Sequence, residues 1–111
     1  KTLKLKVYSG EDGLERLVHG GYVSDLLSDV MGHDREGNIW ITLQTHKNIM
    51  AIASLKDLAA IILVKNNKPA PDTIEKSREE KIPILGTELP TFEISGKVYE
   101  LLQQKARQSI H

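Results

Sequence analysis

The fold of this chain is decided by one stretch, Ala59-Ala60-Ile61-Ile62-Leu63-Val64, which is followed by the polar residues Lys65-Asn66-Asn67-Lys68 and by Pro69. A continuous apolar run of this length that ends at turn-forming residues is typical of a strand covered on both faces. Such strands lie at the centre of parallel sheets, because helices pack on both sides of them. The stretch therefore predicts a central strand of an α/β sheet.

Extended and helical patterns alternate on both sides of this strand. Upstream, Ile39–Leu43 is rich in β-branched and aromatic residues, as a buried strand is, and Ile49–Leu55 carries apolar residues at helical spacing. Downstream, Pro71–Lys81 begins with the proline and acidic residue that suit the first turn of a helix, and Ile82–Leu85 follows as a strand. The alternation predicts right-handed crossovers and a three-layer α/β sandwich, whose largely parallel central sheet is covered by helices.

The amino-terminal part shows shorter patterns. Apolar and charged residues alternate in Leu3–Val7, which predicts a first strand. Two further apolar segments, Leu14–Val18 and Tyr22–Leu27, are separated by His19-Gly20-Gly21. Because paired glycines permit backbone angles that other residues resist, we expect a bend there with a short strand on either side.

A long helix is predicted after Thr91. Its expected inward stripe consists of Phe92, Val98, Leu101 and Leu102. The polar tail 103–111 is expected to fray or project, and Tyr99 and Leu102 are candidates for a subunit contact. Trp40, the single tryptophan, is expected either in the core or in such a contact.

Composition places the chain among folded single domains. The 111 residues suffice for one domain, residues 1–111, and 40% are hydrophobic while 27% are charged. Lys plus Arg equals Asp plus Glu at 15 each, so no net field attracts nucleic acid. The absence of cysteine excludes disulfides and cysteine-held metals, and no apolar run reaches the roughly 20 residues that span a bilayer. We expect a cytoplasmic protein without a membrane segment.

The most polar constellation follows the strand Ile39–Leu43. It is expected at a strand-to-helix junction, where backbone N–H groups and the helix dipole favour an anion, and the loop around Thr91 should gather at the same end of the sheet. The predicted ligand-binding residues are Gln44, Thr45, His46, Asn48, Thr87 and Thr91. The alternative is that Thr45 or Asn48 merely caps the helix and His46 faces solvent.

Neither a metal site nor a catalytic centre is expected. No two of the four histidines have the i, i+4 spacing of a helical zinc motif. His19, His46 and Asp25 could meet in space, but their spacing favours independent surface histidines over a metal site. A nucleophilic Ser24 would need a base and an oxyanion-binding nest, and only His19 is close in sequence. We expect Ser24 and Asp25 to cap a brief helix that ends near Val30, and no cofactor.

The chain resembles the DRTGG domain and, more distantly, the N-terminal domain of HPr kinase/phosphorylase. The residues that carry the resemblance are Gly21–Leu27, Ile61–Val64, Pro69, Pro71, Ile82–Leu85, Thr87 and Thr91-Phe92-Glu93. A further set, Trp40-Ile41-Thr42, Gln44-Thr45-His46 and Asn48, is similar to free-standing DRTGG proteins encoded near iron-only hydrogenase genes. Some of these carry the label "serine kinase", but this sequence has no Gly-x-x-x-x-Gly-Lys-Ser/Thr loop to cradle phosphates.

Two departures separate the chain from the wider family. Where the resemblance predicts Asp-Arg-Thr after the third strand, the chain has Thr45-His46-Lys47, and the expected Gly-Gly after the next strand is replaced near Lys65-Asn66-Asn67. The resemblance therefore supports the fold more strongly than any particular site.

The resemblance implies a function in regulation or dimerisation, because DRTGG domains accompany CBS domains and phosphotransacetylase catalytic domains. We expect a non-catalytic, homodimeric regulatory module that binds a small anionic ligand such as a nucleotide or phosphate, in hydrogenase-linked or energy metabolism. The alternative is a protein-interaction or assembly factor without a small ligand, whose protein partner belongs to a hydrogenase system.

Overall fold

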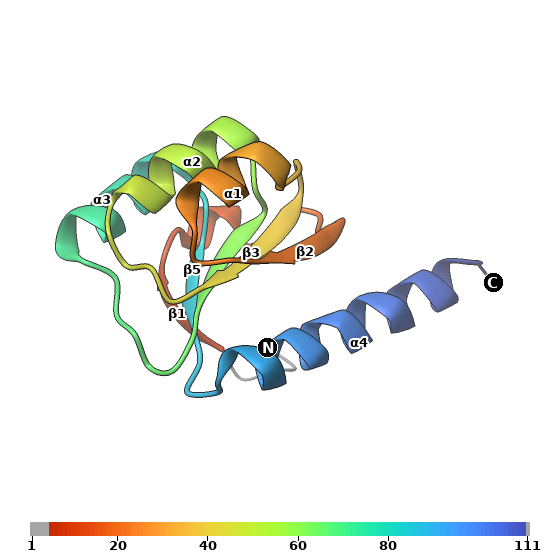
Figure 1. Ribbon diagram of the computed structural model, residues 1–111. Coiled ribbons are helices and arrows are strands. Elements are labelled where there is room, and N and C mark those ends of the chain that lie inside the picture. Colours follow the sequence, from red (N-terminus) through yellow and green to blue (C-terminus); the bar gives the residue numbers. More distant parts are fainter. Residues whose placement is uncertain (1–4, 111) are drawn as a thin grey trace.

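The computed structural model describes residues 5–110, with side chains through residue 105, and contains one five-stranded sheet (Figure 1). The strands are β1 (Lys6–Ser9), β2 (Gly20–Val23), β3 (Asn38–Thr42), β4 (Ala60–Leu63) and β5 (Ile84–Gly86). Their spatial order is β1-β5-β4-β3-β2. Strands β2 to β5 are parallel and β1 is antiparallel to β5. The predicted central strand is confirmed, because every residue of β4 is buried.

The sheet lies between two helical layers. The helices are α1 (Leu27–His33), α2 (Asn48–Lys56), α3 (Pro71–Glu80) and α4 (Thr91–Ile110). Helices α1, α2 and α3 cover one face of the sheet and α4 lies on the other (Figure 1). Strand order follows chain order from β2 to β5, so every right-handed crossover places its helix on the same face. The predicted three-layer α/β sandwich is confirmed.

Each face of the sheet has its own apolar core. Beneath α1 to α3, Trp40, Ile61 and Leu63 are fully buried together with residues of α2. Beneath α4, Ile62 and Val64 pack with Ile94 and Val98 of that helix. Adjacent residues of one strand thus serve opposite faces, as the pleat requires.

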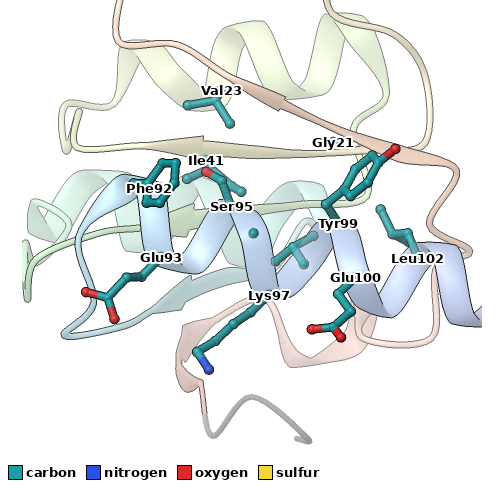
Figure 2. Close-up of a pocket in the computed structure, with 12 residues that line it drawn as sticks. Gly21, Val23, Ile41, Phe92, Glu93, Ser95, Lys97, Tyr99, Glu100 and Leu102 are labelled. Atoms are coloured by element: carbon teal, nitrogen blue, oxygen red, sulfur yellow. The ribbon is translucent and has the colours of Figure 1, made fainter.

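Helix α4 turns part of the predicted stripe towards the sheet, because Val98 and Leu102 pack against the core while Phe92 does not. Ile94 is fully buried and Val98 is 5% exposed, whereas Phe92, predicted to point inward, is 89% exposed. The prediction for Phe92 was wrong, because Ile94 and Val98 lie one turn apart and take the inward face. Figure 2 shows Phe92, Ser95 and Tyr99 along one side of α4, and Glu93, Lys97 and Glu100 along another. The predicted polar tail is helical through Ile110, and His111 lies outside the described residues.

The amino-terminal predictions were less accurate. The first strand is Lys6–Ser9, and part of its predicted range lies outside the described residues. No strand forms in Leu14–Val18: a 3₁₀ turn, Glu11–Gly13, leads into an irregular segment. This segment must cross from β1 at one side of the sheet to β2 at the other, so its backbone has no neighbouring strand to pair with. Gly20 and Gly21, predicted as a bend, begin β2 instead.

Helix α1 also differs from its prediction. It begins at Leu27 and ends at His33, and no side chain caps its first turn. The hydroxyl of Ser24 accepts a hydrogen bond from the N–H of Leu26, which closes the loop before the helix. None of the helices within residues 5–110 is long and apolar enough to cross a membrane.

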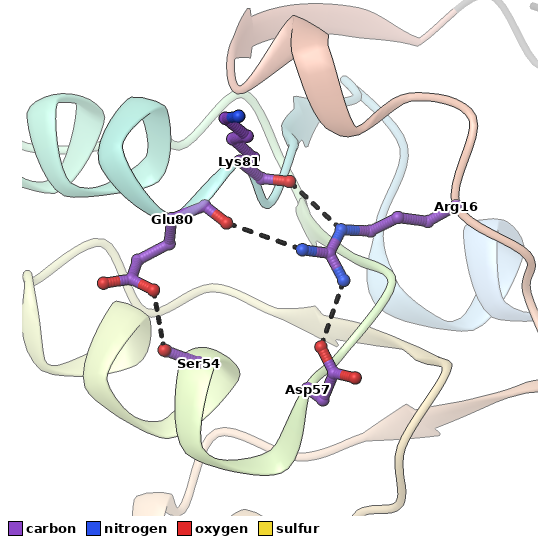
Figure 3. Close-up of polar contacts among 5 residues, drawn as sticks. All are labelled: Arg16, Ser54, Asp57, Glu80 and Lys81. Carbon is purple, nitrogen blue, oxygen red and sulfur yellow. Dashed lines mark hydrogen bonds and ion pairs between the residues drawn. The ribbon is translucent and has the colours of Figure 1, made fainter.

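Arg16 fastens the crossing segment to the ends of two helices (Figure 3). Its Nε donates to the carbonyl of Lys81 at 3.1 Å and its Nη2 donates to the carbonyl of Glu80 at 3.5 Å, at the end of α3. Its Nη1 lies 3.1 Å from Oδ1 of Asp57, which follows α2. A cation near helix carboxyl termini is favourable, because it faces unpaired carbonyls and the negative end of the helix dipole.

We expect the Arg16→Ala variant to lose about 1 kcal/mol of unfolding free energy, since these contacts are partly exposed. Urea denaturation followed by circular dichroism measures the change. Arg16→Lys is the control and should recover less than half of the loss, because one ammonium group cannot reach acceptors on both helices. Equal unfolding free energies of the parent and Arg16→Ala would show that the contacts of Arg16 contribute nothing to stability.

Candidate ligand site at the carboxyl ends of the strands

The four parallel strands end at one edge of the sheet, where the loops before α1, α2, α3 and α4 come together. The predicted ligand-binding residues all belong to this edge. They divide into a group after β3, which contains Gln44, Thr45, His46 and Asn48, and a group after β5, which contains Thr87 and Thr91.

A hydrogen-bonded lock joins the end of β2 to the end of β3. Oδ1 of Asp25 accepts from Thr42 Oγ1 at 2.8 Å and from the N–H of Leu43 at 2.9 Å. In return, Gln44 Nε2 donates to the carbonyl of Asp25 at 2.8 Å. Asp25 therefore braces two loops rather than capping α1 as predicted, and the Gln44 amide nitrogen is already engaged.

His46 closes the amino end of α2. Its Nδ1 accepts the N–H of Asn48 at 3.1 Å, so a neutral ring carries its proton on Nε2. The ring is exposed, as are the side chains of Lys47 and Asn48. The predicted alternative, a cap made by Thr45 or Asn48, differs from the structure, because Asn48 is the first helical residue and Lys47 is the N-cap, with no side chain in a capping hydrogen bond.

Thr45 connects this loop to the next helix. Its carbonyl accepts from the N–H of Ala70 at 3.2 Å and from Oγ1 of the buried Thr73 at 2.9 Å. The start of α3 is thereby held against the loop after β3.

The loop after β4 lies between the two predicted groups, since β4 lies between β3 and β5. Lys65 and Asn66 both have positive φ, 57° and 61°, in the left-handed region that favours glycine. Their N–H groups donate to the carbonyls of Leu89 and Thr87 at 3.0 and 2.9 Å. The Gly-Gly expected from the resemblance is thus replaced by two residues that adopt glycine-like angles, and asparagine tolerates them best.

One residue of each group lines a hollow, and the two hollows are different. Asn48 lines a hollow of about 470 Å³ between α2 and α3, beside Lys47 and Lys76. Thr87 lines one of about 420 Å³ beside Tyr8 and Asn66, and its Oγ1 accepts the N–H of Leu89 at 3.1 Å. Thr91 is half-buried as the first residue of α4.

The winding of the sheet explains why these groups are not drawn into one cleft. Ligand crevices in open α/β sheets form where the strand order reverses and neighbouring loops bend to opposite faces. From β2 to β5 the order does not reverse, and the crossover helices α1, α2 and α3 all leave towards one face, whereas α4 leaves β5 towards the other. The group after β3 and the group after β5 therefore lead to opposite faces of the sheet.

A polar cluster that the sequence did not single out surrounds Asp29 on α1. The hydroxyl of Tyr22 lies 3.0 Å from both carboxylate oxygens, and Nδ1 of His33 lies 3.2 Å from Oδ1. Hydrogen bonds from Ser24 and Tyr22 lower the pKa of Asp29, and burial followed by the bond to Asp29 raises the pKa of Tyr22. The i, i+4 spacing of Asp29 and His33 was the available signal. The cluster holds β2 against α1.

Asp34, just after α1, is a buried carboxylate. Its Oδ1 accepts from the N–H of Arg35 at 2.8 Å and from Nδ2 of Asn38 at 2.9 Å, which closes the turn into β3. Within the described part of the chain, its Oδ2 is buried without a hydrogen-bond partner. Burial raises the pKa of Asp34, against the lowering effects of Asn38, Arg35 and the charge of Lys56.

This raised pKa predicts a pH dependence of stability. The folded chain holds the Asp34 proton more tightly than the unfolded chain, whose Asp pKa is about 3.9. The contribution of the protonated Asp34 carboxyl to stability is therefore complete below that pH, and it is lost as the pH rises through the pKa of Asp34 in the folded chain. We expect the unfolding free energy of the parent, minus that of Asp34→Asn, to fall from pH 4 upward in urea titrations. A difference that is constant with pH would contradict the prediction.

Among residues 5–110, no three His, Cys, Asp or Glu side chains come together in a way that would hold a metal ion.

The chain is similar to a known domain family and to a solved structure that contains a member of it. The DRTGG domain matches residues 1–101. Among solved structures, the chain is similar to the CBS and DRTGG domains of the regulatory region of Clostridium perfringens pyrophosphatase, complexed with the activator diadenosine tetraphosphate. The TM-score is 0.69 at 17% identity, over 88% of this chain and 42% of that one. No curated protein matches at a significant level.

At this identity the similarity shows a shared fold, and the chain spans less than half of the solved regulatory region. The match over residues 1–101 covers β1 to β5, α1 to α3 and the first half of α4. The chain therefore belongs to the DRTGG domain family.

Proposed function

We propose that this chain is a homodimeric regulatory module that senses a small anionic ligand, such as a nucleotide or phosphate, at the carboxyl edge of its sheet. The observation that carries the proposal is the amino end of α2, where the exposed rings and amides of His46 and Asn48 stand beside the cation of Lys47. The N–H groups of Asn48, Ile49 and Met50 already donate to the His46 ring and to the carbonyls of His46 and Lys47, so the positive end of the helix dipole and the Lys47 charge are what favour an anion here.

Two further features support this assignment. The neighbouring loop after β4 adds the exposed lysines Lys65 and Lys68 to the same edge. The similar pyrophosphatase fragment is a regulatory region in complex with a nucleotide activator. The residues proposed for ligand binding are Gln44, Thr45, His46, Asn48, Thr87 and Thr91, of which His46 and Asn48 are the most accessible.

Calorimetric titration and thermal shift with AMP, ATP, diadenosine tetraphosphate and inorganic phosphate test the proposal. A ligand at 100 times its dissociation constant should stabilise the fold by about 2.7 kcal/mol. His46→Ala should weaken binding about tenfold, and His33→Ala, which removes an exposed histidine from α1, is the matched control. No heat and no shift at millimolar ligand would contradict the proposal.

The same titration distinguishes ligand sensing from the alternative function in protein interaction or assembly. An intact chain that binds none of these compounds would favour an interaction or assembly factor, whose expected setting is a hydrogenase system. Mixing the chain with the hydrogenase and following the mass of the complex by light scattering would then test that setting.

A further inference from the structure

An apolar groove runs between α4 and the edge strand β2, on the face of the sheet opposite α1 to α3 (Figure 2). Its volume is about 720 Å³, and Gly21 and Ile41 of the sheet contribute to its lining. Val23 is 47% exposed in this groove, and Tyr99 of α4 is 66% exposed. Three helices cover the opposite face, so this face has room for a second helix beside α4.

Helix α4 carries a second stripe along the groove, in which Phe92 and Tyr99 are exposed while Leu102 also packs against the sheet core. Phe92, Ser95, Tyr99 and Leu102 follow one another at spacings of three, four and three residues, which is the a/d pattern of a helix that packs on another helix. Phe92 is 89% exposed, and the four side chains lie along the groove. The stripe runs beside the inward one formed by Ile94 and Val98 and meets the same core at Leu102.

The carboxyl-terminal half of α4 projects past the sheet (Figure 1). The helix has 20 residues and so spans about 30 Å. Within residues 5–110, one half of α4 therefore has no sheet beneath it, and the groove beside the other half has no helix above it.

We propose that a second copy of this chain fills the groove, with the two α4 helices antiparallel and a two-fold axis near Tyr99. The projecting half of each helix then lies over β2 of the other copy. This inference rests on the homodimer of the proposed function and names its surface. It also accounts for Gly21 in an edge strand, because glycine permits a close approach of another backbone.

The register is self-complementary in size and in charge. With Tyr99 opposite its own copy, Leu102 faces Gly96 and Gln103 faces Ser95, so large side chains meet small ones. Glu93 and Glu100 outnumber the single Lys97 in the first half of α4, whereas the second half carries Lys105 and Arg107. Antiparallel pairing brings the acidic half to the basic half, and parallel pairing would bring like charges together.

Light scattering and sedimentation across concentration test the interface on the full chain. The parent should be a dimer. Tyr99→Glu should raise the dissociation constant at least a hundredfold, because two carboxylates would meet at the axis. Leu55→Glu is the matched control, because Leu55 is 70% exposed on α2, away from the groove. The Leu55→Glu variant should remain a dimer. A monomeric parent, or an unaffected Tyr99→Glu dimer, would overturn the proposal.

Gly21→Val provides an independent variant that leaves the monomer intact. A Cβ at Gly21 would meet only the carbonyl of Ile39 at 3.6 Å, an ordinary contact, so the chain should fold with an unchanged melting temperature at low concentration. The added side chain fills the floor of the groove and should raise the dimer dissociation constant at least tenfold. If the dissociation constant of the Gly21→Val dimer equalled that of the parent, the groove would not be the dimer interface.

Engineered cysteines decide the orientation, since the chain has none of its own. Disulfides need Cα atoms within about 7 Å, and six helical residues span about 9 Å. Gly96 is exposed, and an added Cβ there meets nothing within 4 Å. Under mild oxidation, a mixture of Gly96→Cys and Leu102→Cys chains should therefore cross-link to each other, and Gly96→Cys alone should not. Cross-linking of Gly96→Cys to itself would show parallel helices and overturn the register.

The outcomes separate this inference from the ligand proposal. A monomer that still binds nucleotide would remove the interface and leave the sensing function standing. A dimer that binds no ligand would remove the sensing function and leave the interface standing.

Discussion

The Trp40→Ala variant is expected to be about 3–5 kcal/mol less stable than the parent chain. Trp40 is 0% exposed in the middle of β3, and its neighbours in the core are residues of the sheet and of α2. Truncation would leave a cavity that the packed layers can collapse only in part. The indole Nε1 also donates to the carbonyl of Ser24 at 2.8 Å, so the variant leaves the end of β2 without that donor.

Urea denaturation followed by far-ultraviolet circular dichroism measures this loss without relying on tryptophan fluorescence. Trp40→Phe is the control that keeps most of the apolar volume and removes the N–H group. Its expected loss is about 1–2 kcal/mol, from the missing hydrogen bond and the smaller ring. If Trp40→Ala lost less than about 1 kcal/mol, the assignment of Trp40 to the core would be wrong.

Gly13→Ala should destabilise the chain by about 2–3 kcal/mol or more, through a clash rather than a cavity. Gly13 is buried where the crossing segment passes the end of α3, and a Cβ there would lie 1.9 Å from the carbonyl oxygen of Lys81. That oxygen belongs to the backbone and accepts the Nε–H of Arg16, so neither partner can move alone. Relief of the clash requires the segment and the helix end to separate.

Gly32→Ala is the matched control for this substitution. Gly32 lies within α1, where an added Cβ meets nothing within 4 Å. Because alanine favours the helix over glycine, the variant should gain about 0.5–1 kcal/mol. The same chemical change is thus expected to have opposite signs at two sites, and equal effects in urea titrations would contradict the contact at Gly13.

The layered fold was predictable from local pattern. The run Ala59–Val64 has no polar position to turn towards water, which requires cover on both faces, and the alternation that follows requires crossovers of one hand. The start of α3 at Pro71 and the strand at Ile84 follow from residues that restrict their own backbone. Patterns of this kind need no information about distant neighbours.

The candidate site was only partly accessible in this way. The sequence indicates which loops reach the carboxyl edge, because that follows from parallel strands. It could not show that Asp25 braces Thr42 or that the ring of His46 accepts the N–H of Asn48, since these contacts depend on rotamers set by neighbouring loops. Whether the loops after β3 and β5 form one pocket depends on the winding, and that is a property of the whole sheet.

The sequence by itself determined that the chain is an α/β sandwich with a buried central strand, because hydrophobic periodicity is read within each segment. Tertiary structure alone decided which side of α4 meets the sheet. Both Phe92 and Ile94 are apolar, and only the packing of Ile94 against Ile62 and Val64 leaves Phe92 in solvent. It also decided that Leu14–Val18 has no strand partner, because pairing depends on where distant strands lie.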